Sequence, residues 1–177
     1  MFTFVNGKII QPDGVLEGFC LTVAGGKITG ICRDEAKHEG KIVDAAGNYI
    51  APGFIDIHVH GGGEGDFMDR DMQSIKRIID VLTAHGTTGI YPTTLTCPEE
   101  EIYQAIDAIT DFRSLGINGA EILGIHLEGP YLSIAQGGAQ DPKFIKVPKK
   151  EDYVSLLEYS RLIKRMTFAP ELEGGME

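Results

Sequence analysis

The chain has 177 residues, of which 42% are hydrophobic and 24% are charged, and this composition is typical of a globular protein rather than a disordered one. Lysine and arginine number 16 against 26 aspartates and glutamates, which gives a formal net charge of −10 without a basic run that would bind a nucleic-acid backbone. These features argue against a nucleic-acid partner, although one or two local cations can still hold a small phosphorylated molecule.

The cysteines and the first residues indicate where the protein works. Cys20, Cys32 and Cys97 are odd in number and show neither CxxC spacing nor the density of a disulfide scaffold, so we expect a reducing, cytoplasmic location. The N-terminal residues lack the pattern of a signal peptide, and no apolar run approaches the roughly 18 residues of a membrane span. We therefore expect a soluble protein without a membrane partner.

Residues 1 to about 50 consist of short apolar runs separated by glycine. Asn6-Gly7 and Gly25-Gly26 stand between strand-like segments, and such dipeptides are typical of the turns of β-hairpins. The sequence therefore predicts a small all-β unit in residues 1–50.

From residue 51 onward, strand-like segments alternate with helix-like segments, which predicts a parallel sheet. The predicted strands are residues 54–60, 88–94, 122–129 and 166–171. The first crossover carries apolar side chains at helical spacing, namely Ile75, Ile78, Ile79 and Leu82. The second opens with a capping box formed by Thr96 and Glu99.

The length of residues 51–177 matters, because a closed barrel of eight strand-helix units takes about 250 residues. About four strands fit into this stretch, and no helix follows the last one. We therefore predict the first half of an α/β barrel, and we expect the chain to be truncated.

The first of these strands carries two histidines on one face. Because side chains alternate along a strand, His58 and His60 share a face with Asp56. Ile55 and Ile57 point the other way, so we expect them to pack on helices while the histidines project inward at the carboxyl end of the strand. There the imidazoles could share one cation, or they could be satisfied polar side chains at a strand end.

A second motif, His126-Leu127-Glu128, lies near the end of the third predicted strand, and the alternation points His126 and Glu128 inward. A carboxylate that faces an apolar interior is costly unless it is paired or bound to a metal, and it can also bridge two cations. The two motifs together predict a metal site formed by His58, His60 and Glu128. We expect His126 to support a ligand rather than to bind the metal itself.

These segments resemble a known family. Residues 51–61, which include both histidines, resemble the opening of the amidohydrolase superfamily. Further segments are similar to N-acetylglucosamine-6-phosphate deacetylases, namely residues 85–88 with 92–93, 126–132, 137–142 and 168–171. The resemblance follows the family's order along essentially the whole chain.

The resemblance implies a small β-sandwich, part of which would be residues 1–50, beside a metal-dependent-hydrolase (β/α)8 TIM barrel whose first half would be residues 51–177. It implies hydrolysis of the acetamide of N-acetylglucosamine 6-phosphate to glucosamine 6-phosphate and acetate. It also implies one or two divalent ions of the zinc, iron or manganese type, and a homodimer for the full-length protein.

The resemblance also implies roles for single residues. Glu128 would bind the metal together with two histidines from later strands, and His58 and His60 would favour capacity for a second ion. Ala139 and Gln140 would lie in the substrate loop, where the Gln140 amide could donate a hydrogen bond to the substrate carbonyl. The general-base aspartate and a phosphate-binding arginine are expected beyond residue 177, so no catalytic residue is expected within the chain.

Two alternatives remain open. Dihydroorotase-like and dipeptidase-like amidohydrolases often bridge their metals with a modified lysine on the fourth strand, but the predicted strand 166–171 contains no lysine and Lys164 precedes it. The chain could instead be an inactive half-barrel remnant that binds metal weakly or associates with another half-barrel.

Overall fold

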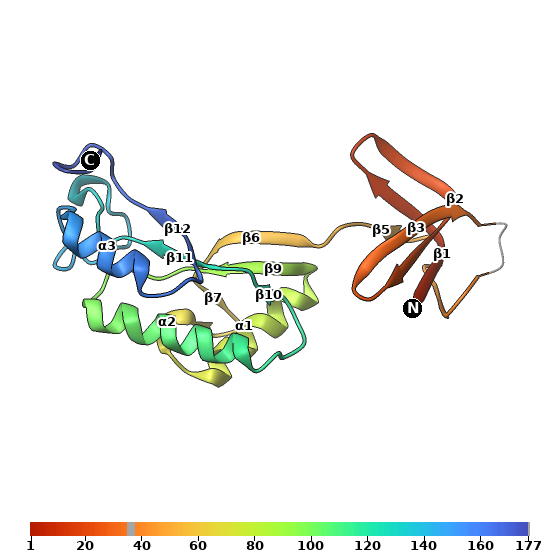
Figure 1. The fold of residues 1–177 in the computed structure, drawn as a ribbon, viewed down its shortest axis with the longest axis horizontal. Helices are drawn as coiled ribbons and strands as arrows, with labels where there is room; N and C mark the ends of the chain where they lie inside the picture. The colour runs from red at the N-terminus through yellow and green to blue at the C-terminus, as the bar shows by residue number, and fades with distance from the viewer. Residues whose placement is uncertain (35–37, 177) are drawn as a thin grey trace. The chain divides into compact units, whose positions relative to one another are not determined.

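The computed structural model describes residues 1–34 and 38–176, which form two compact units, Met1–Pro52 and Gly53–Glu177 (Figure 1). The described part of the first unit contains strands only, whereas the second unit alternates strands with helices. Within the described residues, no helix is both long and apolar enough to cross a membrane.

The first unit is a five-stranded sheet. Its strands are β1 (Phe2–Gln11), β2 (Gly14–Ala24), β3 (Lys27–Arg33), β4 (Lys41–Asp44) and β5 (Tyr49–Ile50). β1 pairs antiparallel with β2, and β2 pairs antiparallel with β3, while β4 and β5 both pair in parallel with β1. The described strands belong to one sheet, so the assignment of this unit to a β-sandwich stays a prediction.

The two predicted hairpin turns of this unit have different outcomes. Gly25 and Gly26 connect β2 to β3 with φ values of 57° and 73°, as a two-residue hairpin loop requires. The prediction for Asn6-Gly7 is wrong, because both residues lie inside β1, where the register with β2 shifts. A Cβ at Gly7 would lie 2.5 Å from the Ile50 side chain, so the glycine permits close packing rather than a turn.

The second unit is built on parallel strands. They are β6 (Phe54–Val59), β9 (Thr87–Pro92), β10 (Glu121–Ile122), β11 (Ile125–Glu128) and β12 (Ile163–Thr167). β6 pairs with β9, β9 with β10, and β11 with β12, and a parallel bridge between Thr93 and His126 joins the two groups. The described strands of this mixed α/β unit thus form an open arrangement rather than a closed barrel.

Short elements and helices complete this unit. They are β7 (Gly61–Gly62), β8 (Gly65–Asp66), the 3-10 helices η1 (Phe67–Asp69) and η2 (Ile134–Gln136), and the helices α1 (Met72–Ala84), α2 (Glu99–Ser114) and α3 (Lys150–Glu158). α1 and α2 lie on the same side of the strands (Figure 1). Their apolar faces form the core with the strands, and its fully buried members include Ile75, Ile78 and Ile79 of α1, Ile106 and Ile109 of α2, and Ile90, Ile125 and Leu127.

The predicted capping box of the second crossover is wrong. α2 begins at Glu99 after Pro98, and within the described chain no side chain caps it. The Thr96 hydroxyl is buried without a hydrogen-bond partner among the described residues. The backbone N–H of Thr96 donates to the side-chain oxygen of Gln140. A tertiary contact thus takes the place of the local cap. The negative charges of Glu99 to Glu101 in the first turn stabilise α2 by their interaction with the helix dipole.

Two strand predictions also need correction. The predicted strand 122–129 is divided in two, because the chain changes its pairing partner from β9 to β12 at Gly124. The predicted strand 166–171 lies earlier, at Ile163–Thr167, so that Lys164 and Arg165 fall inside it. Pro170, which cannot donate a ladder hydrogen bond, stands beyond its end.

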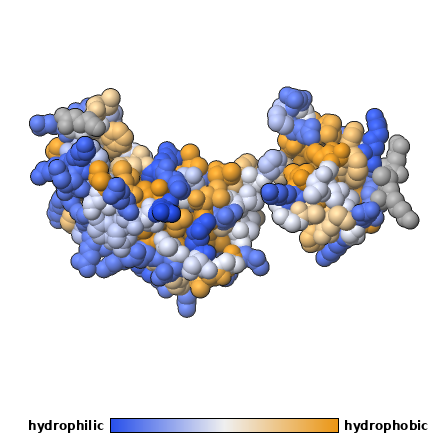
Figure 2. Space-filling view, viewed as in Figure 1, coloured by the Kyte–Doolittle hydropathy of each residue, from blue (hydrophilic) through white to orange (hydrophobic). Residues whose placement is uncertain are grey.

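The apolar face of β6 does not pack as expected. Ile55 is 62% exposed and Ile57 is 49% exposed, whereas Val59 packs against the core. Helix α1 packs against β7, β8 and β9. Figure 2 shows apolar side chains gathered on the visible surface of the second unit.

Replacing Ile106 with alanine tests the core of the second unit. Ile106 is fully buried, so the substitution should lower the free energy of unfolding by about 2–5 kcal/mol, as measured by urea denaturation. Ile134→Ala is the control, because that side chain is 69% exposed and should change stability by less than about 0.5 kcal/mol. Equal effects of the two substitutions would contradict the described core.

Candidate metal centre

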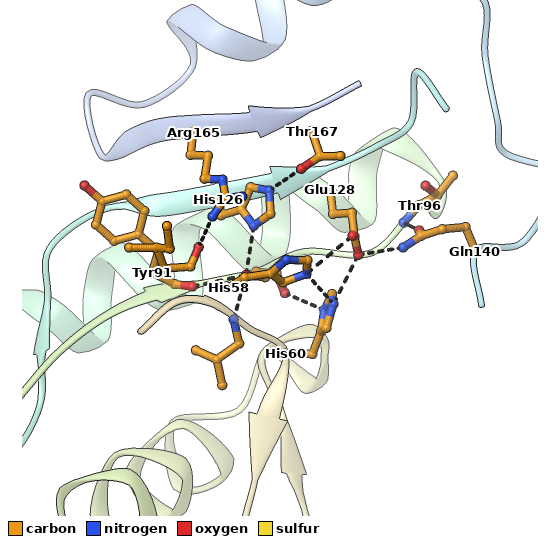
Figure 3. A network of polar contacts seen from close by, with 12 residues as sticks. His58, His60, Tyr91, Thr96, His126, Glu128, Gln140, Arg165 and Thr167 are labelled. Atoms are coloured by element: carbon orange, nitrogen blue, oxygen red, sulfur yellow. Dashed lines mark hydrogen bonds and ion pairs between the residues drawn. The ribbon is translucent and has the colours of Figure 1, made fainter. Parts of the chain in front are cut away.

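Three side chains predicted from the sequence meet at the carboxyl ends of two strands. His58 lies near the end of β6, His60 directly follows it, and Glu128 is the last residue of β11. The two histidine Nε2 atoms are 3.2 Å apart. The Nε2 atoms of His58 and His60 lie 3.3 Å and 3.1 Å from the Glu128 carboxylate oxygens (Figure 3).

Thr93, which follows β9 and is fully buried, fixes the relative position of the two strands. Its N–H donates to the carbonyl of Val59 at 2.9 Å, and its hydroxyl oxygen accepts the Val59 N–H at 3.0 Å. Its hydroxyl also lies 3.1 Å from Nδ1 of His126 on β11. One side chain thus ties β6 to β11, the strands that carry the histidines and the glutamate.

Thr93 also determines which nitrogen of His60 carries a proton. The Thr93 carbonyl lies 3.2 Å from His60 Nδ1, and because a carbonyl only accepts, Nδ1 must donate. In a neutral imidazole Nε2 then carries a lone pair, which faces the Glu128 carboxylate. Two electron-rich groups at this distance repel each other unless a proton or a metal cation lies between them.

The donor set fits a metal ion. Ligand atoms at about 2.0–2.2 Å from a tetrahedral ion lie roughly 3.3–3.6 Å from one another. The two histidine Nε2 atoms are 3.2 Å apart, which is close to this value, and they lie 3.3 Å and 3.1 Å from Oε1 and Oε2 of Glu128, respectively. One ligand atom from each of the three residues lies within 4.8 Å of the other two. The contact of His60 Nδ1 with a backbone carbonyl is of the kind that usually orients a metal-binding histidine.

His126 lies beside this group rather than in it. It is fully buried, its ring centroid is 4.6 Å from that of His58, and its Nε2 lies 2.8 Å from the Thr167 hydroxyl. Burial, together with the positive charge of Arg165, lowers the pKa of His126 to about 4. His126 is therefore neutral at physiological pH and bonds to a hydroxyl group through each nitrogen.

Gln140 reaches the site from the loop after β11. Its Oε1 accepts the N–H of Thr96 at 2.7 Å, which turns its amide nitrogen toward Glu128, where Nε2 donates to Oε2 at 2.8 Å. The orientation of the amide thus follows from the Thr96 contact. The other predicted loop residue, Ala139, is exposed in the preceding turn.

Three residues of this network were not predicted from the sequence. Thr93 and Thr167 bond to the two nitrogens of His126, and Arg165 donates through Nη1 to the carbonyl of Ile57 at 3.0 Å. The sequence offered one indication of them: both threonines stand near the ends of predicted strands, as the motif histidines do. Lys164 is exposed, and it alternates with Arg165 and Thr167, so it does not face His126.

The fold and the site together define the class of protein. Parallel strands alternate with helices, and the first and third strands of the alternation bring a His-x-His pair and a glutamate together at their carboxyl ends. This mixed α/β unit with a candidate metal site at the strand ends is what the resemblance to amidohydrolases implies.

Known proteins agree with this class and narrow it. No protein-family model matches the chain. An N-acetylglucosamine-6-phosphate deacetylase of Bacillus subtilis is 32% identical to this chain, over 96% of this chain and 44% of the relative. One of Danio rerio is 34% identical, over 96% of this chain and 44% of the relative. The solved deacetylase of Pasteurella multocida is 29% identical over 97% of this chain and 45% of its own, with a TM-score of 0.86.

Over nearly its whole length, this chain is therefore similar to one part of N-acetylglucosamine-6-phosphate deacetylases. That part is a little under half of the length of the curated relatives.

The pKa of His126 predicts a pH dependence of stability. Between pH 6.5, the ordinary pKa of histidine, and about 4, the unfolded chain binds a proton at this residue that the native chain does not. The free energy of unfolding should therefore fall as the pH is lowered through this range, by up to about 3 kcal/mol. Urea denaturation in EDTA measures this loss, which should be smaller in His126→Gln. An equal loss in both proteins would contradict the assignment.

Proposed function

We propose that this chain provides the His58, His60 and Glu128 part of a metal-dependent deacetylase that hydrolyses N-acetylglucosamine 6-phosphate to glucosamine 6-phosphate and acetate. The observation that carries the proposal is the convergence of His58, His60 and Glu128 at the strand ends, with His60 Nδ1 turned to the Thr93 carbonyl and Nε2 left toward the other two side chains. The relatives' names supply the substrate.

Glu128, His58 and His60 would hold one or two divalent ions of the zinc, iron or manganese type, which suit imidazole and carboxylate ligands. When bound, such an ion supplies Lewis acidity and lowers the pKa of its water. The protein holds the ligands ready: Thr93 orients His60, and Gln140 holds one carboxylate oxygen of Glu128. His126 remains neutral behind them and adds no charge to the site.

Gln140 would have a second role toward the substrate. Its amide carries two N–H groups, of which one donates to Glu128. The other could donate to the acetyl carbonyl as negative charge develops on its oxygen. Ala139 would line the same loop. Because an amide does not titrate near neutral pH, this donor would be available throughout the working range.

The remaining machinery belongs to the part of the relatives that this chain does not span. We expect residues 51–177 to be the first half of a (β/α)8 barrel and residues 1–50 to be part of a small β-sandwich. The general-base aspartate, the phosphate-binding arginine and two further metal histidines would follow residue 177. The full-length protein would be a cytoplasmic homodimer.

A dihydroorotase-like or dipeptidase-like activity is less well supported. Such enzymes would need a lysine of the fourth strand among the metal ligands. β12 does contain a lysine, contrary to the sequence-based prediction, but Lys164 is exposed on the face opposite Thr167, which contacts His126. Its orientation, rather than its absence, argues against this alternative.

Zinc binding tests the proposed centre. His60→Ala should lower the affinity of the EDTA-treated chain for Zn²⁺ by at least about tenfold in isothermal titration calorimetry, because it removes a ligand. His85→Ala is the matched control, since His85 ends α1 and its Nδ1 lies 2.8 Å from the Val81 carbonyl. If both variants bind zinc as the wild type does, the centre is wrongly assigned.

Acetate release tests the reaction. The longest polypeptide that the gene encodes should release acetate from N-acetylglucosamine 6-phosphate, and EDTA should abolish the reaction. Gln140→Ala should lower kcat by about 10²-fold, and Gln140→His should restore most of it, because either side chain can donate to the carbonyl.

Release of acetate that EDTA does not affect would refute the metal-dependent reaction. Zinc binding by the 177-residue chain without turnover would instead support the remnant alternative for this chain alone.

A further inference from the structure

Two cysteines of the first unit lie directly opposite each other. Cys20 of β2 and Cys32 of β3 are partners in the antiparallel register, and their sulfur atoms are 2.7 Å apart. Directly opposed residues of antiparallel strands have Cα atoms about 4.5–5.5 Å apart. This range lies within the roughly 4.4–6.8 Å that a disulfide spans, so the backbone need not move to bridge the pair.

The two thiols differ in access. Cys20 is 1% exposed, whereas Cys32 is exposed, and both line a cavity of about 180 Å³ together with Met1, Thr3, Thr22, His38 and Glu39. A small reagent can therefore reach Cys32 first and leave Cys20 as the internal thiol. The contact with Cys20 raises the pKa of Cys32, so a smaller fraction of Cys32 is thiolate at neutral pH.

We propose that Cys20 and Cys32 form a reversible disulfide, which links β3 covalently to β2, when the chain reacts with a small disulfide oxidant such as oxidised glutathione. β3 pairs with β2 alone among the described strands of the sheet. The disulfide would therefore fasten an edge strand that is otherwise held on one side only.

The disulfide forms in two thiol–disulfide exchange steps. The Cys32 thiolate attacks one sulfur of oxidised glutathione, breaks its S–S bond and releases one glutathione thiolate. Cys20 then loses its proton, attacks Sγ of Cys32 and expels the second glutathione. Two protein thiols are oxidised to one disulfide, and one oxidised glutathione is reduced to two thiols.

Cys97 serves as an internal comparison. It lies in the second unit, it is partly buried, and burial raises its pKa to about 11. We expect it to stay a free thiol under conditions that close the Cys20–Cys32 pair.

The test equilibrates the chain in glutathione redox buffers at about pH 8.5, where thiolates are more abundant, and maps the state of all three cysteines by mass spectrometry of non-reduced peptides. The effective concentration of one thiol for the other should be at least about tenfold higher in the native chain than in urea, because the fold holds the pair together. Cys32→Ser should abolish the cross-link.

An effective concentration in the native chain equal to or below that in urea would overturn the proposal. So would a native chain that accumulates glutathione on Cys32 without closing to Cys20. The comparison with urea keeps the test decisive even where a cysteine substitution destabilises the sheet.

Discussion

The site depends on the buried contacts of Thr93. Parallel strands bring their carboxyl ends to one edge of a sheet, but they do not by themselves set which side chains meet there. Thr93 does so by binding both backbone groups of Val59, the Nδ1 proton of His60 and the ring of His126. The positions of two motifs that are far apart in the sequence therefore depend on the backbone and the hydroxyl group of one residue between them.

The sequence could predict the convergence of His58, His60 and Glu128, because strand alternation and parallel order both follow from local patterns. It could not predict features that distant residues decide. Thr96 has the sequence of a helix cap, yet its N–H bonds to Gln140, which is far away along the chain. Asn6-Gly7 has the sequence of a turn, yet packing against Ile50 keeps it inside a strand.

The same limit applies to the chemistry of the site. Sequence patterns identified the residue types of the candidate ligands, but the role of His60 Nδ1 as a donor and the orientation of the Gln140 amide follow only from their partners. The neutral state of His126 likewise arises from its burial and from the charge of Arg165. Arg165 lies in β12, a strand that was predicted to begin at residue 166.

The tight hairpin after His60 adds a constraint of another kind. A Cβ at Gly61 would lie 2.1 Å from the Gly65 carbonyl, so glycine alone allows the chain to turn back, and the N–H of the buried Phe67 then donates to the His60 carbonyl at 2.9 Å. His60 is held by β6 on one side and by this hairpin on the other. The backbone of His60 therefore loses its conformational entropy during folding. An ion that binds at the proposed centre does not have to offset this loss.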